Sequence, residues 1–263
     1  MHHFLTRRWI TIHLMTLIII AVCLSLASWQ LGRLQDRRAE NARLSAQTRL
    51  EPAGLDSLLP GAEVSPAELT AAEFRRTRVQ GTFDAGEQVI LQSRSLNRLQ
   101  GNHLLTPLVL ASGEAILVDR GWVPLPTNEQ VLSESEPPSG QVTVEGVLLP
   151  SEEKGLLGVS DPPPGEVTAT PRVDLDRLAG QLEYPLYPIY LRLQSQEPAS
   201  SSELPKPVPI PRPSEGPHRE YAIQWALFAV TALVIYLGLL RRDISRRRSD
   251  LAEIEEPETV PAS

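Results

Sequence analysis

The chain has 263 residues, of which 41% are hydrophobic and 22% are charged, and its formal net charge is −7. This length allows one ordinary domain with appendages, or at most two small domains. The acidic balance excludes a protein that binds nucleic acid through bulk positive charge. The single cysteine, Cys23, excludes a disulfide framework within the chain and a cysteine-rich metal cluster.

Two uncharged apolar runs lie near opposite ends of the chain, Ile10–Ala27 and Tyr221–Leu240. As helices rising about 1.5 Å per residue, they would reach roughly 30 Å, the thickness of a bilayer's hydrocarbon core. We therefore predict transmembrane helices over residues 9–29 and 218–240. A cleaved secretory signal is the alternative for the first run, but its length exceeds the usual apolar core of about 7 to 15 residues, which favours an uncleaved anchor.

Arginine residues set the expected orientation. Five of them follow the second run closely: Arg241, Arg242, Arg246, Arg247 and Arg248. The positive-inside rule places this tail, residues 241–263, in the cytoplasm, and its end is acidic. Two spans then put residues 1–8 on the same side. We expect a bacterial plasma (inner) membrane protein with both termini cytoplasmic, the bacterial origin resting on the absence of an Arg- and Ser-rich presequence before Trp9.

Between the spans, residues 30–197 change from helical to strand-like periodicity. Gln30–Leu50 is rich in helix formers and predicts a continuation of the first helix, and short helices are expected at Pro66–Phe74 and, capped by Asp174, at Asp174–Leu182. Six short apolar runs predict strands: Arg78–Gly81, Gln88–Gln92, Leu104–Leu110, Ala115–Val123, Val142–Leu148 and Tyr187–Leu193. Short turns between most of them favour antiparallel pairing. The fold class is therefore α+β, with two transmembrane helices flanking a mostly antiparallel β extracytoplasmic domain.

Residues 198–217, called here the proline-rich segment, differ from the preceding domain in composition. Proline lacks a backbone N–H, so this segment cannot form a regular strand ladder. We expect an extended, polyproline-like linker that tethers the domain to the second span.

Motifs for common enzyme chemistry are absent from the sequence: there is no GxSxG, no glycine loop for phosphate, no HExxH and no CxxC. A serine with His103 and Asp119 forms a triad only on paper, so we predict no catalytic residues and no metal site. His13 lies inside the first span, where it has either a functional role or faces the partner helix. His218 lies at the entrance to the second span, where an imidazole can ligate a metal or haem iron, cap the helix, or meet lipid headgroups.

Several stretches resemble one known family in order along nearly the whole chain. The first span ends in LASWQLGRLQDR, which resembles the Trp-Gln-x-x-Arg signature of the Surfeit-locus-1 family. The strand region contains VQGTFDAGEQVILQSR and GNHLLTPLVLASGEAILVDRGWVP, which resemble the family's Gly-x-Phe segment and its Gly-x-His-x-x-Thr-Pro-Leu and Arg-Gly-Trp-Val-Pro motifs. VTVEGVLLP and PHREYAIQWALFA resemble the later strand and the second span.

This resemblance implies a membrane-anchored, non-enzymatic assembly factor for haem–copper cytochrome c oxidase, which assists haem a insertion or maturation of subunit I. His218 matches a position associated with haem binding in some bacterial members, so it is the candidate cofactor-binding residue for transient haem a. The implied partners are the lipid bilayer, oxidase subunit I and haem A synthase. Two alternatives stay open: a membrane-anchored cell-envelope hydrolase or transferase, and a passive envelope scaffold.

The Arg120-Gly121-Trp122 turn in the most specific of these motifs has a structural and a functional interpretation, and we favour the structural one. Gly121 would permit a backbone conformation that a side chain would hinder. Trp122 would anchor the core or an interface.

Overall fold

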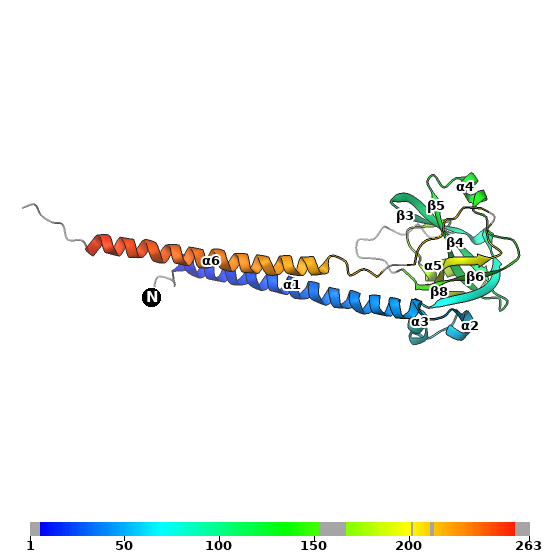
Figure 1. The fold of residues 1–263 in the computed structure, drawn as a ribbon, viewed down its shortest axis with the longest axis horizontal. Coiled ribbons are helices and arrows are strands. Elements are labelled where there is room, and N and C mark those ends of the chain that lie inside the picture. The colour runs from blue at the N-terminus through cyan, green and yellow to red at the C-terminus, as the bar shows by residue number, and fades with distance from the viewer. Residues whose placement is uncertain (1–5, 153–166, 201, 211–212, 256–263) are drawn as a thin grey trace, which may run out of the picture. The chain divides into compact units, whose positions relative to one another are not determined.

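The computed structural model describes residues 6–152, 167–200, 202–210 and 213–255 (Figure 1). The chain forms two compact units, residues 1–41 with 214–263 and residues 42–213. Long apolar helices near the two ends flank a mixed, mostly antiparallel sheet. The predicted α+β fold class is confirmed.

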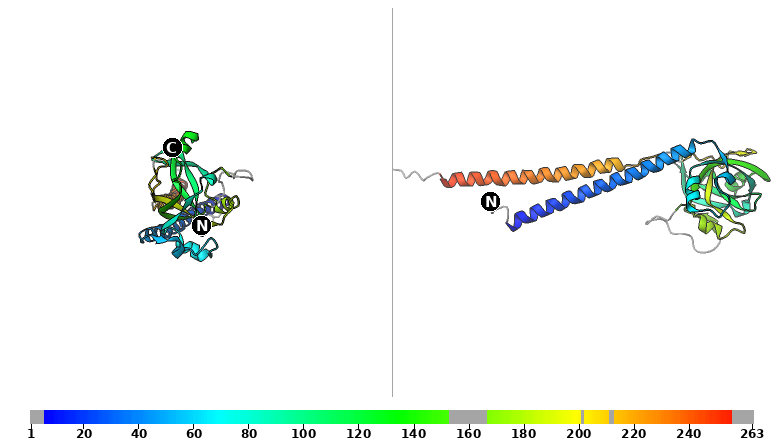
Figure 2. Two further views of the ribbon diagram at one scale, coloured as in Figure 1. Left: turned by 90° about the vertical axis from the view of Figure 1, so that its right-hand side faces the viewer. Right: turned by 90° about the horizontal axis from the view of Figure 1, so that it is seen from below.

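Two long helices dominate the first unit, α1 (Arg7–Thr48) and α6 (His218–Glu255). They run side by side (Figures 1 and 2), and the Tyr236 hydroxyl of α6 lies 2.9 Å from Nδ1 of His13 in α1. Each contains a window long and apolar enough to cross a membrane, and only 11% of that window in α1 and 6% in α6 is buried, unlike the core helix of a soluble protein. The contact with Tyr236 shows that His13 faces the partner helix. Helix α1 also continues beyond the apolar run, as expected.

The second unit is built on a sheet of eight strands. Six are long: β2 (Arg76–Phe83), β3 (Val89–Leu96), β4 (Leu99–Val109), β5 (Ala115–Pro124), β6 (Gln141–Pro150) and β8 (Leu186–Glu197). Two-residue strands, β1 (Ala53–Gly54) and β7 (Ala169–Thr170), lie at the edges of the order β1-β2-β6-β8-β5-β4-β3-β7. Because β2 also pairs with β4, the strands β2, β6, β8, β5 and β4 close into a small barrel.

The six predicted strands are all present, and the structure extends most of them by a few residues. The long strands pair antiparallel except β5 with β8, whose pairing is parallel. This exception is possible because a long connection, containing β6 and α5 (Leu175–Ala179), separates the two strands and allows a crossover.

Two apolar clusters form the core of this unit. The first includes Phe83, Leu108 and Leu191, and the second includes Leu105 and Leu117 with residues of α5. Helix α5 begins where predicted, since the Asp174 side chain accepts a hydrogen bond from Arg177 N at 3.2 Å. The expected helix near residue 66 is α3 (Pro66–Ala72), which starts with a Ser65–Glu68 capping box. Three short helical elements were not expected, α2 (Leu55–Leu58), the 3-10 helix η2 (Ala85–Glu87) and α4 (Glu129–Glu134), and neither were the two-residue strands β1 and β7.

The proline-rich segment is anchored to the second unit. Lys206 exchanges two 2.8 Å backbone hydrogen bonds with Trp122 of β5, and Gln194 of β8 donates to the Val208 carbonyl at 3.1 Å. The segment thus adds an isolated antiparallel bridge to the domain, an attachment that its composition did not suggest. Residues 256–263 of the expected acidic tail and residues 1–5 of the expected cytoplasmic N-terminus lie outside the described residues.

Candidate functional site

His218, the predicted site residue, is the first residue of α6 and is partly buried. Its Nδ1 lies 2.8 Å from Oε1 of Gln30, which is on α1, 188 positions earlier in the chain. An amide oxygen can only accept a hydrogen bond, so Nδ1 donates it. In the neutral ring the lone pair then belongs to Nε2, the nitrogen that is left for a metal ion or haem iron.

Two further contacts hold the approach to His218 against α1. The Arg38 guanidinium donates to both carboxylate oxygens of Glu215, at 2.8 and 3.1 Å, and Ser214 N donates to Asn41 Oδ1 at 3.1 Å. The hydrogen bond from Arg38, followed by its charge, lowers the pKa of Glu215 below its ordinary value. We call Gln30, Arg38 and Asn41 with Ser214, Glu215 and His218 the helix clasp. It fixes where the imidazole lies without using the imidazole's second nitrogen.

The clasp includes a glycine for a local reason. Gly216 has a φ of +64°, which L side chains rarely adopt. A Cβ at this position would lie 3.4 Å from Cδ2 of the His218 ring, which is ordinary van der Waals contact. The backbone conformation, and not the space around it, is therefore what favours glycine here.

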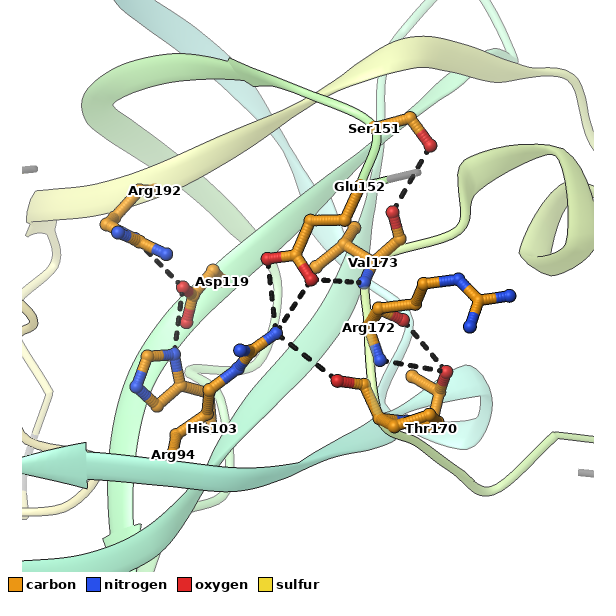
Figure 3. A network of polar contacts seen from close by, with 10 residues as sticks. Arg94, His103, Asp119, Ser151, Glu152, Thr170, Arg172, Val173 and Arg192 are labelled. Atoms are coloured by element: carbon orange, nitrogen blue, oxygen red, sulfur yellow. Dashed lines mark hydrogen bonds and ion pairs between the residues drawn. The ribbon is translucent and has the colours of Figure 1, made fainter. Parts of the chain in front are cut away.

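His103 and Asp119, the pair considered for a triad, do lie together, but in the interior of the second unit. Nδ1 of His103 is 3.1 Å from Oδ2 of Asp119, which also accepts from Arg192 Nε at 3.0 Å (Figure 3). These residues come from the neighbouring strands β4, β5 and β8. Burial would raise the pKa of Asp119, but the hydrogen bonds and charges of His103 and Arg192 outweigh it and lower the pKa.

A second polar group lies beside this one in Figure 3. The Arg94 guanidinium donates to both oxygens of Glu152, at 2.8 and 3.1 Å, and Glu152 accepts from Val173 N at 3.2 Å. These contacts join β3 to the segments around β6 and α5. The polar atoms of Arg94 and Glu152 are therefore explained by a structural role, the connection of these elements to one another.

The geometry gives a triad no support. No serine side chain is hydrogen bonded to His103 among the residues that the structure describes. Neither His103 nor Asp119 lines the pocket of about 410 Å³ beside β8 or the one of about 340 Å³ beside α4. The described part of the chain also holds no group of three or more His, Cys, Asp or Glu that could bind a metal ion.

The Arg120-Gly121-Trp122 motif lies inside strand β5 and not in a turn, so that part of the expectation was wrong, but Gly121 and Trp122 have the structural features expected of them. Gly121 has a φ of +134°, and a Cβ there would lie 2.4 Å from the carbonyl oxygen of Lys206. Trp122 is buried, with 3% of its surface exposed. The absence of a side chain at Gly121 thus allows the proline-rich segment to approach β5 closely.

Sequence reasoning did not assign roles to Gln30 or Arg192. Gln30 belongs to the Trp-Gln motif quoted above, but the sequence does not show that its partner is His218. Arg192 lies between Leu191 and Leu193 in a predicted strand, which is an unusual place for a charge, but the sequence does not reveal that its partner is Asp119.

Comparison with known proteins yields one family. The model of the SURF1 family matches residues 17–230. An uncharacterized SURF1-like protein of Mycobacterium tuberculosis is 27% identical over 261 residues, covering 95% of this chain and 90% of that protein. A SURF1-like protein of Rickettsia felis is 24% identical, covering 89% of this chain and 98% of its own. Surfeit locus protein 1 of Arabidopsis thaliana is 30% identical, but covers 44% of this chain and 34% of its own.

Proposed function

The chain belongs to the SURF1 family, and from this premise we propose that it is a membrane-anchored assembly factor for haem–copper cytochrome c oxidase. In this role it assists haem a insertion into subunit I, with subunit I and haem A synthase as partners. The proposal includes an inner-membrane location with both termini cytoplasmic and the β domain outside. It needs no catalytic residue of the chain's own.

One observation carries the haem part of this proposal: the Nδ1–Gln30 hydrogen bond of His218. A ligand histidine is commonly oriented by a hydrogen bond from its second ring nitrogen, which also sets the tautomer. Gln30 supplies this contact, and Nε2 makes no hydrogen bond to any described residue. Haem a would be cargo here, with the imidazole as the protein's ligand to its iron.

Complementation tests the oxidase role. A deletion strain of the source bacterium should show reduced haem a absorbance in its membranes and reduced oxidase activity, and the full-length gene should restore both. Affinity purification of the restored protein should recover oxidase subunit I. Unchanged oxidase activity and haem a content in the deletion strain would refute the proposed role.

Spectroscopy tests the ligand role separately. Protein purified from cells that make haem a should show a Soret band, and His218→Ala should lose most of it. Gln30→Leu should weaken the band less, because it removes the orienting acceptor but keeps the imidazole. Arg219→Ala, which changes the exposed neighbour of His218, is the matched control and should keep the band. A spectrum unchanged in His218→Ala would exclude His218 as the ligand.

A further inference from the structure

Arg120 has a charge that its surroundings do not balance. Only 2% of the residue is exposed, and the guanidinium has no carboxylate partner among the described residues. It donates through Nη1 to the amide oxygen of Gln88 at 3.2 Å, and its carbon Cζ lies 5.4 Å from the ring centroid of Phe83. Its Nε is buried without a hydrogen-bond acceptor. Such a group costs free energy unless something pairs with it.

The backbone around Arg120 directs this side chain. Gly121 pairs with Leu104 and Asp119 pairs with Leu105, so the ladder between β4 and β5 skips Arg120. An extra residue of this kind is a β-bulge, which re-aims a side chain. Asp119, the preceding residue, is bound to His103 and Arg192 and is not bonded to Arg120. The carboxylate that is adjacent to Arg120 in sequence is therefore engaged by other side chains and does not pair with this buried cation.

A pocket of about 410 Å³ lies against Arg120. Its walls include Leu193 and Gln196 of β8 and residues of the proline-rich segment, among them Glu203, Pro205 and Pro207. This volume lies in the range of small-molecule sites, which combine apolar walls with a few polar groups. Serine and glutamine side chains also line the pocket, but the surface that faces it is mostly apolar, and Arg120 is the one buried cation in the described part of its lining.

We propose that this pocket binds a small organic monocarboxylate with an apolar body, whose carboxylate pairs with the guanidinium of Arg120. A guanidinium matches a carboxylate in geometry and in charge. A monoanion fits better than a dianion, because one cation balances one charge and the exposed Glu203 adds a negative charge to the lining. Although burial lowers the pKa of Arg120 to about 10, the side chain remains charged at neutral pH. The pocket shares no residue with the helix clasp, and the proposal does not depend on the proposed oxidase role.

The test uses the full chain in nanodiscs of zwitterionic lipid, with 1-naphthoate as the probe and 1-naphthamide as its neutral analogue. Calorimetric titration, corrected with empty nanodiscs, should give saturable 1:1 binding of naphthoate. Naphthamide should bind at least about tenfold more weakly, because it cannot form the charge-assisted pair. Equal binding of the two probes, or no saturable naphthoate binding, would overturn the proposal.

Two variants locate the binding. Arg120→Gln should abolish the preference for naphthoate over naphthamide. Glu203→Gln should tighten naphthoate binding about twofold, because it removes a repulsive charge from the lining, and this exposed change leaves the core intact. Glu63→Gln, an exposed acid outside the pocket, is the matched control and should change neither affinity. If Arg120→Gln does not fold, the Glu203→Gln result still decides, and unchanged naphthoate affinity in that variant contradicts the site.

Discussion

At the scale of single residues, Asp119 is the shared partner of the buried His103 and the partly buried Arg192. It accepts from both His103 and Arg192, and its own exposed fraction is 1%. Removing one member of such a group leaves the others without a counter-charge, which commonly costs more than the group itself contributes. The Asp119 carboxylate is therefore expected to stabilise the fold mainly by pairing with His103 and Arg192.

Asp119→Asn should lower the free energy of unfolding by about 3 kcal/mol, because it leaves the partly buried Arg192 without its counter-charge. Thermal unfolding of the full chain in detergent, compared with wild type, measures this. Glu63→Gln also removes one negative charge, but from an exposed position, and should change stability by less than about 0.5 kcal/mol. A loss in Asp119→Asn no larger than that in Glu63→Gln would contradict the assignment.

The pH dependence of the same carboxyl follows from its lowered pKa. The pKa of Asp119 is lower in the folded chain than in the unfolded chain, where it is near 3.9. Its stabilisation is therefore present above about pH 4 and is lost as pH falls through the folded value. The stability difference between wild type and Asp119→Asn should therefore narrow as the pH falls below about 4, which thermal unfolding of both proteins over a pH series measures.

Gly121 is needed for two separate reasons, backbone conformation and close approach. Gly121→Ala should destabilise the domain by about 2 kcal/mol or more, since the new Cβ meets the Lys206 carbonyl as well as an unfavourable φ. Gly113→Ala separates the two causes, because Gly113 has a φ of +87° with open space where a Cβ would be. Its loss should be near 1 kcal/mol. Equal losses in the two variants would show that the approach of the proline-rich segment contributes nothing.

At the scale of elements, Asp174 provides the N-cap of α5, which covers the second core cluster. Asp174→Ala should cost about 1 kcal/mol of stability, because the Arg177 N–H loses its acceptor. Asp174→Asn should recover most of this, since the amide oxygen can accept the same bond. Thermal unfolding of both variants tests the prediction. If Asp174→Asn is as unstable as Asp174→Ala, the stability depends instead on the contact between Arg172 and the Asp174 carboxylate, at 3.4 Å.

Most strands could be predicted because their sequences carry alternation or apolar runs between turn residues. In β2, for example, Val79 and Phe83 are buried and the residues between them alternate with exposed positions. The bulge at Arg120 could not be predicted, because β5 is buried on both faces from Ala115 to Val123 and shows no period of two. The six-residue α4 was missed because so short a helix has no measurable period, although Asn128 caps it by accepting from Val131 N.

The candidate site was predictable only in part, because contacts between distant segments have no local sequence pattern. The position of His218 follows from its place before an apolar run and from the motif order. Its partner Gln30 is far away in sequence, and pairing the two requires the rotational register of α1 against α6, which no local pattern encodes. The pocket beside Arg120 could not be predicted either, because its walls come from β8 and from the proline-rich segment, which are joined only by the fold.

At the scale of the whole molecule, the proposed function requires that the chain cross the membrane twice. The apolar faces of α1 and α6 are largely exposed, with side chains such as Leu17 at 66% and Val234 at 61%. Exposed apolar surface of this extent is unfavourable in water and suits a lipid environment. Arginines are concentrated at the end of α6 beyond this surface, which favours a cytoplasmic C-terminus.

Reporter fusions test this arrangement directly. A fluorescent protein fused after Ser263 should fluoresce, because it folds in the cytoplasm, whereas alkaline phosphatase fused after Gln196 should be active, because its disulfides form outside. With the two reporters exchanged, the phosphatase after Ser263 should be inactive and the fluorescent protein after Gln196 should be dark, which serves as the control. The protein should also stay in the membrane pellet after carbonate extraction. An active phosphatase at Ser263 would place that terminus outside, and the clasp residue His218 would then enter the bilayer from the cytoplasmic side, away from the client that the proposal requires.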